Sequence, residues 1–336
     1  MPAPAYLLVK GKAGLGNRIL SLLTGVLYAR LTGRTIVVDW RDPIYSSGNR
    51  NVFHDLFHAP GILASLPPGE SRGVAPAFWQ GNLDRTVDET LRACGLVDSP
   101  LRQKRTAVDV ARLDYVEQIA VFWALIERIQ PMRRHFHGRF LHYRSSTNEE
   151  ILRDLLRELP PGEVVAERLA RFRRQHWDDA VVGVHLRSSD RQSRTRPILA
   201  AVDRVLDAAS GARLFVATDN QDVLRRFRNR YGASRVISTE KWYPASGAPM
   251  HRDPGCPDRL ENARMALLDM HLLAAAGWLI TDQRSSFAYL ARLLFPGPAS
   301  RVSNADPAGF LPRHWAHEIG GLYIACKGAW KRADRR

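Results

Sequence analysis

The residues best suited to bind an anion follow a short apolar run in the middle of the chain. The run Val181–Val184 has the composition of a buried strand, and His185, Arg187 and Asp190 come soon after it. Ligands of open α/β sheets bind beyond the carboxyl ends of the strands, where an arginine pairs well with a phosphate or a carboxylate. An Arg187–Asp190 ion pair that closes the loop is the structural alternative.

Two later strand candidates also end in polar residues. Asp219 follows the candidate 214–218, and Ser285 and Ser286 follow the candidate 278–281. Parallel strands place their carboxyl ends at one edge of a sheet, so we expect these polar residues to line one crevice. The two serines precede a helical pattern, where hydroxyl groups and free backbone amides either bind an anion or only cap the helix.

A carboxylate lies on the apolar face of the helix predicted at 258–276. Asp269 shares that face with methionine and leucine residues, and a buried carboxylate requires a partner. Guanine presents a ring N–H and an exocyclic amine side by side, and one carboxylate can accept both. A structural partner such as Arg264 or His271 is the alternative.

A glycine-rich turn near the N-terminus joins a strand candidate to a helical pattern. Its sequence is Gly14-Leu15-Gly16-Asn17-Arg18, and its glycines allow backbone amides to approach a phosphate. The turn lacks the full dinucleotide fingerprint and the Gly-Lys-Ser or Gly-Lys-Thr ending of a P-loop. Neither of those two sites is therefore predicted.

The elements that position these residues alternate as in a parallel sheet. In the first half, strand candidates at 6–10 and 35–40 flank the glycine-rich turn and a helical pattern, and another helix is predicted at 115–129. In the second half, three strand candidates alternate with helical patterns. We predict an α/β fold with two Rossmann-like domains. The predicted segments are two domains at 1–174 and 175–305 and a C-terminal segment at 306–336 that crosses back to the first domain.

Composition excludes several classes of protein. The 336 residues are 45% hydrophobic and 25% charged, as in a globular protein of two domains. The net charge of +15 comes mainly from arginine and favours anionic partners, but the arginines are scattered and no nucleic-acid-binding motif is present. The three cysteines lack zinc-site spacing and suggest a reduced compartment. We predict a cytoplasmic protein with no metal, no specific nucleic-acid partner and no membrane span.

Six short motifs follow one another in a fixed order over nearly the whole chain, with a poorly matched middle from 59 to 174. They are Gly14–Arg18, Thr32–Thr35 leading into Asp39–Arg41, Gly183–Arg187, Ala217–Asp219, Leu268–Leu273, and Ser285–Ser286 before Ala291–Leu294. This set resembles the bacterial nodulation-type α-1,6-fucosyltransferases. The wider superfamily comprises the α-1,6- and protein O-fucosyltransferases.

The resemblance implies a GT-B-like glycosyltransferase. It would move L-fucose from GDP-β-L-fucose to a glycan hydroxyl with inversion, for instance in α-1,6 linkage to N-acetylglucosamine. No metal and no cofactor besides this co-substrate would be needed. The first domain would bind the acceptor and the second the GDP-sugar. Two alternatives stay open: transfer of another GDP-sugar, and a basic nucleotide- or nucleic-acid-binding protein without turnover.

The resemblance also implies residue roles. Arg187 would hold the β-phosphate and the glycosidic oxygen, while His185 and Asp269 would contact guanosine. Asp219 would support the nucleotide site, a serine at the later strand end would bind the diphosphate, and Asn17 would reach the sugar–diphosphate from the opposite domain. The predicted donor-binding residues are Gly14, Gly16, Asn17, Arg18, His185, Arg187, Asp219, Asp269, Ser285 and Ser286.

The chain departs from the family pattern beside the central motif. Ser188 stands where relatives often have a second basic residue, and the following stretch lacks the glutamate proposed as a base in some relatives. The expected catalytic residues are Arg187 and Asp190, the latter as a base or as support for the arginine. Asp39 and Glu240 are the alternatives for the base.

Overall fold

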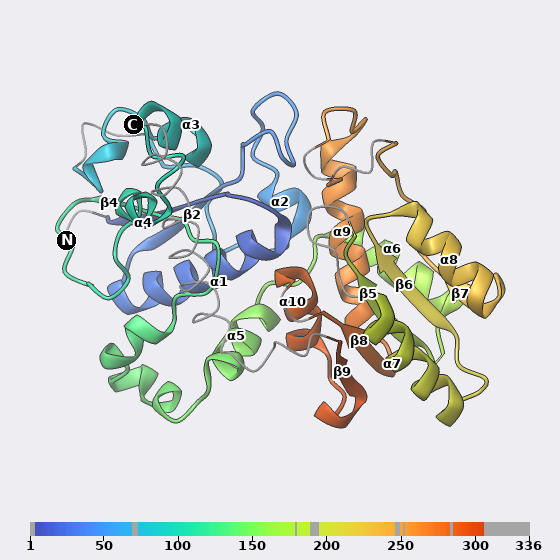
Figure 1. The fold of residues 1–336 in the computed structure, drawn as a ribbon. Helices are drawn as coiled ribbons and strands as arrows, with labels where there is room; N and C mark the ends of the chain where they lie inside the picture. The colour runs from blue at the N-terminus through green and yellow to red at the C-terminus, as the bar shows by residue number, and fades with distance from the viewer. Residues whose placement is uncertain are drawn as a thin grey trace, which may run out of the picture.

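Two parallel β-sheets, one in each half of the chain, organise the protein (Figure 1). Most of their strands are short apolar runs with buried residues, as expected for parallel sheets with both faces covered, and the edge strand Val302–Asn304 is only partly buried. The fold is known from a computed structural model, and every structural statement concerns the part of the chain that it describes. The described residues are 4–68, 73–178, 180–188, 195–245, 249–250, 253–282 and 285–305.

The N-terminal sheet has the strand order β2-β1-β4-β3, and all its neighbouring strands are parallel. Helix α1 (Leu15–Thr32) leads from β1 to β2 and ends at Gly33, which adopts the left-handed backbone conformation with φ of 69°. Such an ending is common because glycine has no Cβ to clash there. The strands are β1 (Tyr6–Lys10), β2 (Thr35–Asp39), β3 (Val74–Ala75) and β4 (Ile119–Phe122).

The helix predicted at 115–129 is wrong, because this stretch contains β4. Ile119 to Phe122 pairs with β1 on one side and β3 on the other, in the interior of the N-terminal sheet. The apolar residues there satisfied a helical period, but a run of β-branched and aromatic residues also suits a strand that is buried on both faces. Pairing with β1 and β3 makes this stretch a strand and not a helix.

The C-terminal sheet has the order β7-β6-β5-β8-β9, again with parallel neighbours. The chain reverses its direction of winding between β5 and β8, and ligands of open α/β sheets bind at such a point. The strands are β5 (Val182–Leu186), β6 (Leu214–Thr218), β7 (Val236–Ile237), β8 (Trp278–Thr281) and β9 (Val302–Asn304). The predicted α/β class with two Rossmann-like sheets is confirmed.

Helices cover the C-terminal sheet and fill the space between the two sheets (Figure 1). Helix α6 (Glu163–His176) packs against α9 (Arg259–Ala274), and α10 (Ser286–Leu294) packs against α9, α1 and α5 (Asn148–Arg157). The remaining helices are α2 (Phe53–Leu56), α3 (Val87–Ala93), α4 (Pro100–Gln103), α7 (Thr195–Ala208) and α8 (Gln221–Tyr231), with 3-10 turns η1 (Ala77–Trp79), η2 (Lys104–Thr106), η3 (Gln130–His135), η4 (Gly138–Arg144) and η5 (Ala299–Arg301).

The two halves share one hydrophobic core. Buried leucines of α1, α5, α9 and α10 belong to a single cluster that extends from the first sheet to the second. Polar contacts add to it: Arg292 of α10 is paired with Glu149 of α5, and Arg153 Nε donates to the carbonyl of Leu293 over 3.1 Å. Apolar burial of this extent stabilises by about 25 cal/mol for each Å². The position of the second half relative to the first is therefore set by packing.

Candidate functional site

The polar strand ends of the C-terminal sheet meet as expected. His185, near the end of β5, is in register with Ala217 of β6, and the backbone N–H of Ser188 donates to Asp219 Oδ1 over 2.8 Å. This bond ties the segment after β5 to the segment after β6. The backbone on either side of Arg187 is thus held at both ends, by the strand and by Asp219. Asp190 lies outside the described residues.

His185 is buried and stacks on an aromatic ring. Its imidazole lies 5.2 Å from the ring of Phe287, at an interplanar angle of 29°. Burial lowers the pKa of His185 to about 4, although the carboxylates of Asp219 and Asp282 act in the opposite direction. The ring is therefore neutral at pH 7. Its Nδ1 has no hydrogen-bond partner among the described residues, so one ring nitrogen remains available.

Arg187 lies close to residues of both halves. Burial raises the pKa of Tyr45, a residue of the N-terminal half, while the positive charges of Arg18 and Arg187 act against that rise. Arg187 also opposes protonation of His185 in its own half. Tyr45 in turn accepts a hydrogen bond at Oη from the backbone N–H of Leu15, over 2.9 Å. The charge of Arg187 therefore acts both on Tyr45, which bonds to the start of α1, and on the end of β5.

The starts of α1 and α10 touch each other across the two halves. Ser286 Oγ donates to Asn17 Oδ1 over 2.6 Å, and Asn17 Nδ2 donates to the carbonyl of Leu125 over 2.7 Å. Ser285 caps α10, because its Oγ accepts from the backbone N–H of Ala288. Two helix starts bring two positive dipole ends to one place, and the backbone N–H groups of Leu15 and Asn17 already bond to Tyr45 and Gly14. This junction suits an anion.

Gly16 makes this junction possible. A Cβ on Gly16 would lie 2.6 Å from the backbone nitrogen of Phe287 and 2.7 Å from Ser286 Oγ. These distances are far below van der Waals contact, so only glycine fits. The sequence pointed to a close approach by a phosphate, but the group that approaches Gly16 in the structure is the backbone of α10. Gly14 caps α1 without a side-chain hydrogen bond.

Arg18 supports the glycine-rich turn from inside the protein. Its side chain is fully buried, its Nη2 lies 2.6 Å from Asp42 Oδ2, and its Nε donates to the carbonyl of Ala13 over 2.8 Å. The guanidinium also lies over the rings of Trp40 and Tyr45. Arg18 therefore orders the turn, and its predicted contact with the donor stays a prediction.

Asp269 is buried on α9, but its partners differ from the structural alternatives predicted. Thr239 Oγ1 donates to Oδ1 over 2.6 Å, and the ammonium of Lys241 pairs with Oδ2. Burial lowers the pKa of Lys241, but the charges of Asp269 and Tyr243 and the hydrogen bond to Asp269 together outweigh it, and the net pKa is raised. Arg264 and His271 were thus the wrong candidates. Both actual partners lie in the loop after β7, and nothing in the local sequence marks them.

The alternative bases predicted for the reaction have different surroundings. Asp39 accepts hydrogen bonds from Lys10 Nζ over 2.6 Å and from Arg41 Nε over 2.8 Å. Burial alone raises the pKa of Asp39, but hydrogen bonds from Arg41 and the charge of Lys10 bring it below its ordinary value. A carboxylate so stabilised is a weak base. Glu240 is exposed, on the loop that carries Lys241.

Comparisons with known proteins show which proteins the chain is similar to. Nodulation protein Z of Bradyrhizobium diazoefficiens is 22% identical over 325 residues, which cover 87% of this chain and 79% of that protein. Among solved structures, the fucosyltransferase NodZ from Bradyrhizobium matches with a TM-score of 0.59 and 21% identity, over 88% of this chain and 94% of the other. The chain has the fold of the nodulation-type fucosyltransferases. No protein-family model matches it.

Two further solved structures extend the comparison to the wider superfamily. POFUT1 in complex with GDP has a TM-score of 0.54 and 12% identity, over 90% of this chain and 98% of that one. A mutant of Arabidopsis thaliana FUT1 in complex with GDP has a TM-score of 0.52 and 16% identity, over 87% of this chain and 68% of that one. These structures share the fold that the motif resemblance implies.

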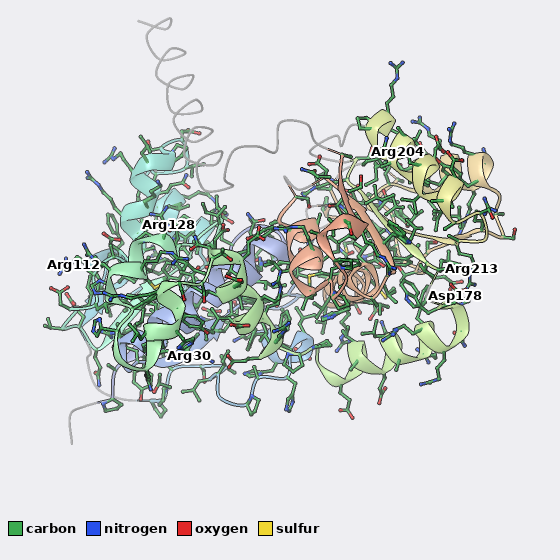
Figure 2. All side chains as sticks on the ribbon, turned by 90° about the horizontal axis from the view of Figure 1, so that it is seen from below. Arg30, Arg112, Arg128, Asp178, Arg204 and Arg213 are labelled. Atoms are coloured by element: carbon green, nitrogen blue, oxygen red, sulfur yellow. The ribbon has the colours of Figure 1, made fainter. Side chains whose placement is uncertain are left out.

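Two features, a metal-binding cluster and a membrane-spanning helix, are absent from the described residues. These residues contain no group of three or more histidine, cysteine or acidic side chains arranged to hold a metal ion. None of their helices has the length and apolar character needed to cross a membrane. Positive charge is spread over both halves, as the labelled arginines in Figure 2 show, and Arg30, Arg112 and Arg213 form ion pairs with carboxylates.

Proposed function

We propose that the protein transfers L-fucose from GDP-β-L-fucose to a hydroxyl group of a glycan, with inversion at the sugar. The observation that carries this proposal is the junction of α1 and α10 beside Arg187, between two parallel sheets. It gathers helix starts and a guanidinium where a sugar diphosphate can reach both halves. The fold is that of NodZ, which has been studied with GDP and soaked with GDP-fucose, and of POFUT1 bound to GDP.

Arg187 would supply the main catalytic effect. Negative charge builds on the departing GDP as the glycosidic bond breaks and the sugar becomes oxocarbenium-like. The backbone that carries this guanidinium is held by β5 and by the Ser188–Asp219 bond, so the group would stabilise that charge with little reorganisation. Neutral His185, stacked on Phe287, would contact the nucleoside through its available nitrogen. No described residue stands out as the general base, and Asp190 keeps its predicted role as base or support.

Asp269 and Lys241 together would read the guanine base. A carboxylate has about four lone-pair sites, so Asp269 retains acceptor capacity beside Thr239 and Lys241. It would accept the ring N–H and the exocyclic amine of guanine. The ammonium of Lys241 would donate to the carbonyl oxygen of the base. Adenine carries an amino group at that position, so the pair would favour GDP over ADP.

The linkage that we propose is taken from a relative. NodZ is described as an α-1,6-fucosyltransferase, and we extend that linkage, to an N-acetylglucosamine-containing acceptor, to this chain. The reaction would need no metal, because Arg187 and the two helix starts supply the positive charge. We also place the protein in the cytoplasm, where Cys94 and Cys256, both free in the structure, would stay reduced.

A thermal-shift screen with GDP, GDP-fucose, UDP and ADP tests the donor. A ligand that binds only the folded state raises its stability, by about 2.7 kcal/mol at a concentration one hundred times the Kd. We expect GDP and GDP-fucose to raise the melting temperature and the other two nucleotides to have little effect. Equal shifts with all nucleotides, or none, would refute the donor assignment. If GDP binds selectively but an activity assay shows turnover of a different GDP-sugar, that sugar takes the place of fucose in the proposed reaction.

A further inference from the structure

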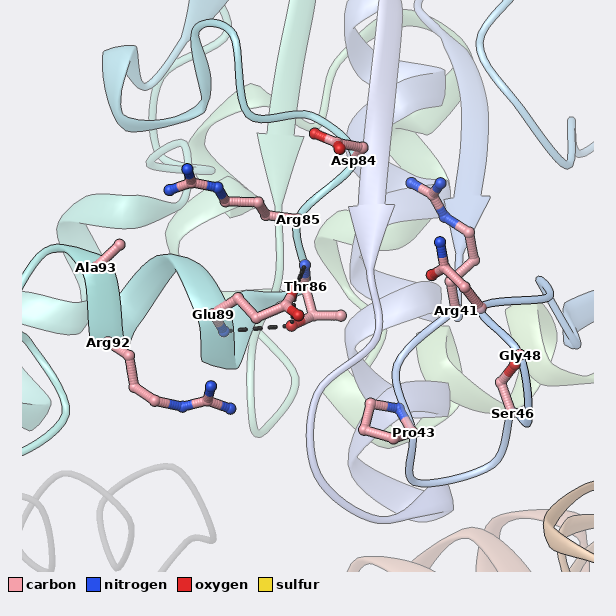
Figure 3. A pocket seen from close by; sticks show the side chains of 11 residues that line it. Arg41, Pro43, Ser46, Gly48, Asp84, Arg85, Thr86, Glu89, Arg92 and Ala93 are labelled. Atoms are coloured by element: carbon pink, nitrogen blue, oxygen red, sulfur yellow. Dashed lines mark hydrogen bonds between the residues drawn. The ribbon is translucent and has the colours of Figure 1, made fainter.

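A polar groove lies at the carboxyl edge of the N-terminal sheet (Figure 3). Its volume is about 730 Å³. One wall is the loop after β2, which carries Arg41, and the other is the segment that leads into α3 together with α3 itself. The lining residues are Arg41, Pro43, Ser46, Gly48, Asn49, Asp84, Arg85, Thr86, Glu89, Arg92 and Ala93.

A buried lysine anchors both walls. Lys10 has only 2% of its side chain exposed and lies at the end of β1, between the walls. Its Nζ is 2.6 Å from Asp39 Oδ2 under the first wall and also bonds to the backbone carbonyls of Leu83 and Arg85 in the second, the latter over 2.8 Å. All three N–H donors of this ammonium bond to the protein, so Lys10 fixes the two walls relative to each other. The groove is therefore preformed.

The guanidinium of Arg41 is fixed in this groove. Its Nε and Nη2 each donate to Asp39 over 2.8 Å, and no hydrogen bond holds its Nη1 within the described part of the chain. Because Lys10 also pairs with Asp39, the cluster of Lys10, Asp39 and Arg41 keeps one net positive charge. The planar guanidinium of Arg41 is thus fixed in one orientation and still has N–H groups that can donate. This geometry suits a carboxylate or sulfate.

The opposite wall adds two arginines, as Figure 3 shows. Arg85 and Arg92 are exposed, and neither forms an ion pair with another described residue. The acidic side chains of the groove are Asp84 and Glu89, and Glu89 is held at the start of α3 by hydrogen bonds from Thr86. Three guanidinium groups among hydroxyl, amide and carboxylate groups match an oligosaccharide that carries anionic substituents.

The groove also adjoins the junction of the two halves. The loop that forms its first wall contains Asp42, which pairs with Arg18 of the glycine-rich turn, and Tyr45, which bonds to Leu15 and lies near Arg187. The same loop thus lines the groove and bonds to the glycine-rich turn, and an acceptor of several sugars would extend from the groove past this loop to the proposed phosphate site.

We propose that this groove binds the acceptor, and that the acceptor is an oligosaccharide with anionic substituents, either carboxylates of acidic sugars or sulfates. The proposal rests on the proposed function, because it names the second substrate of the same reaction. Arg41, Arg85 and Arg92 would hold the anionic groups, and the hydroxyl and acidic side chains would bind sugar hydroxyl groups.

Calorimetric titration with three oligosaccharides of equal length tests this, in the presence of saturating GDP. The probes are an oligouronate, a sulfated oligosaccharide and a neutral N-acetylglucosamine oligomer. We expect an anionic probe to bind at least about tenfold more tightly than the neutral one, as a charge-assisted bond to one anionic group allows. Tighter binding of the oligouronate identifies carboxylates, and tighter binding of the sulfated probe identifies sulfates.

Matched variants place the binding in the groove. The double variant Arg85→Ala/Arg92→Ala should lose about tenfold or more in affinity for the anionic probe. Arg102→Ala/Arg105→Ala removes the same charge from exposed positions outside the groove and should change it little. Equal binding of neutral and anionic probes, no binding of any, or equal effects of both double variants overturns the groove assignment.

The thermal shift with GDP, measured on the same samples, separates the two proposals. A GDP-selective shift without preference for an anionic probe overturns the acceptor class and leaves the donor assignment standing. Binding of the anionic probe without a GDP-selective shift overturns the proposed function, and with it the designation of this ligand as an acceptor.

Discussion

At the scale of single residues, charge and burial divide the site into groups that bind and groups that support. His185 and Arg187 lie at the strand end where a ligand is expected, and Arg18 is buried inside with Asp42. Both arginines belong to motifs of the same family, and both are among the predicted donor-binding residues. Burial distinguishes them in the structure, because the guanidinium of Arg18 is fully buried and already paired with Asp42.

Replacing Arg187 with lysine should lower the turnover of GDP-fucose by about 100-fold or more. Lysine keeps the positive charge but loses the planar fork, and loss of one preorganised donor to a transition-state anion costs about 10²–10³ in rate. Steady-state kinetics with saturating donor measure the effect. Arg204→Lys, at an exposed position of α7, is the control and should retain wild-type turnover. Turnover of Arg187→Lys within a few-fold of wild type would remove the proposed role.

His271 should make the protein less stable as the pH falls. Burial lowers its pKa to about 4, against about 6.5 in the unfolded chain, so between these values the unfolded state binds more protons. Its contribution is complete above pH 6.5 and is lost as the pH falls toward 4. In urea unfolding, His271→Leu should reduce the stability difference between pH 7 and pH 5 by about 2 kcal/mol. The same substitution at exposed His137 should leave that difference unchanged.

At the scale of elements, the junction of α1 and α10 depends on one residue without a side chain. Gly16 allows the backbone at the start of α10 to lie against the start of α1, and the Ser286–Asn17 hydrogen bond closes the contact. The order of strand, turn and helix could be predicted from the sequence because each element has a local pattern. The contact between two helix starts could not, because it joins residues 269 positions apart.

Substituting Gly16 with alanine should destabilise the protein by about 1–3 kcal/mol, because the new methyl group meets backbone atoms that cannot move aside alone. Chemical denaturation measures the loss. Gly61→Ala is the matched control, since a Cβ there meets nothing within 4 Å. If Gly16→Ala is as stable as Gly61→Ala, the helix starts do not lie as close as the structure has them.

At the scale of the whole molecule, the two sheets are held together by a common core, and the proposed donor site lies where their helices meet. The domain ranges 1–174 and 175–305 stay a prediction. The predicted boundary falls within α6, which packs against α9 and is linked to it by the Arg168–Glu261 ion pair. The predicted return of segment 306–336 to the first domain concerns residues outside the described part of the chain.

Removal of divalent metal ions should leave fucosyl transfer unchanged. The proposed mechanism balances the diphosphate charge with Arg187 and with the starts of α1 and α10, so no ion is needed for that purpose. Turnover after dialysis against EDTA, compared with turnover in added Mg²⁺ or Mn²⁺, measures this. A loss on dialysis that either ion restores would contradict metal independence.

The sequence by itself determined the alternation of strands and helices, the polar strand ends and the resemblance to the fucosyltransferases. The first two follow from local periodicity and from the rule that parallel strands end at one edge, and the resemblance rests on six short motifs in a fixed order. Only the tertiary structure decided that Lys241 and Thr239 are the partners of Asp269, that Gly16 faces α10, and that Lys10 joins the two walls of the groove. Such pairings join residues far apart in the chain, and packing selects them from many candidates that local patterns leave equivalent.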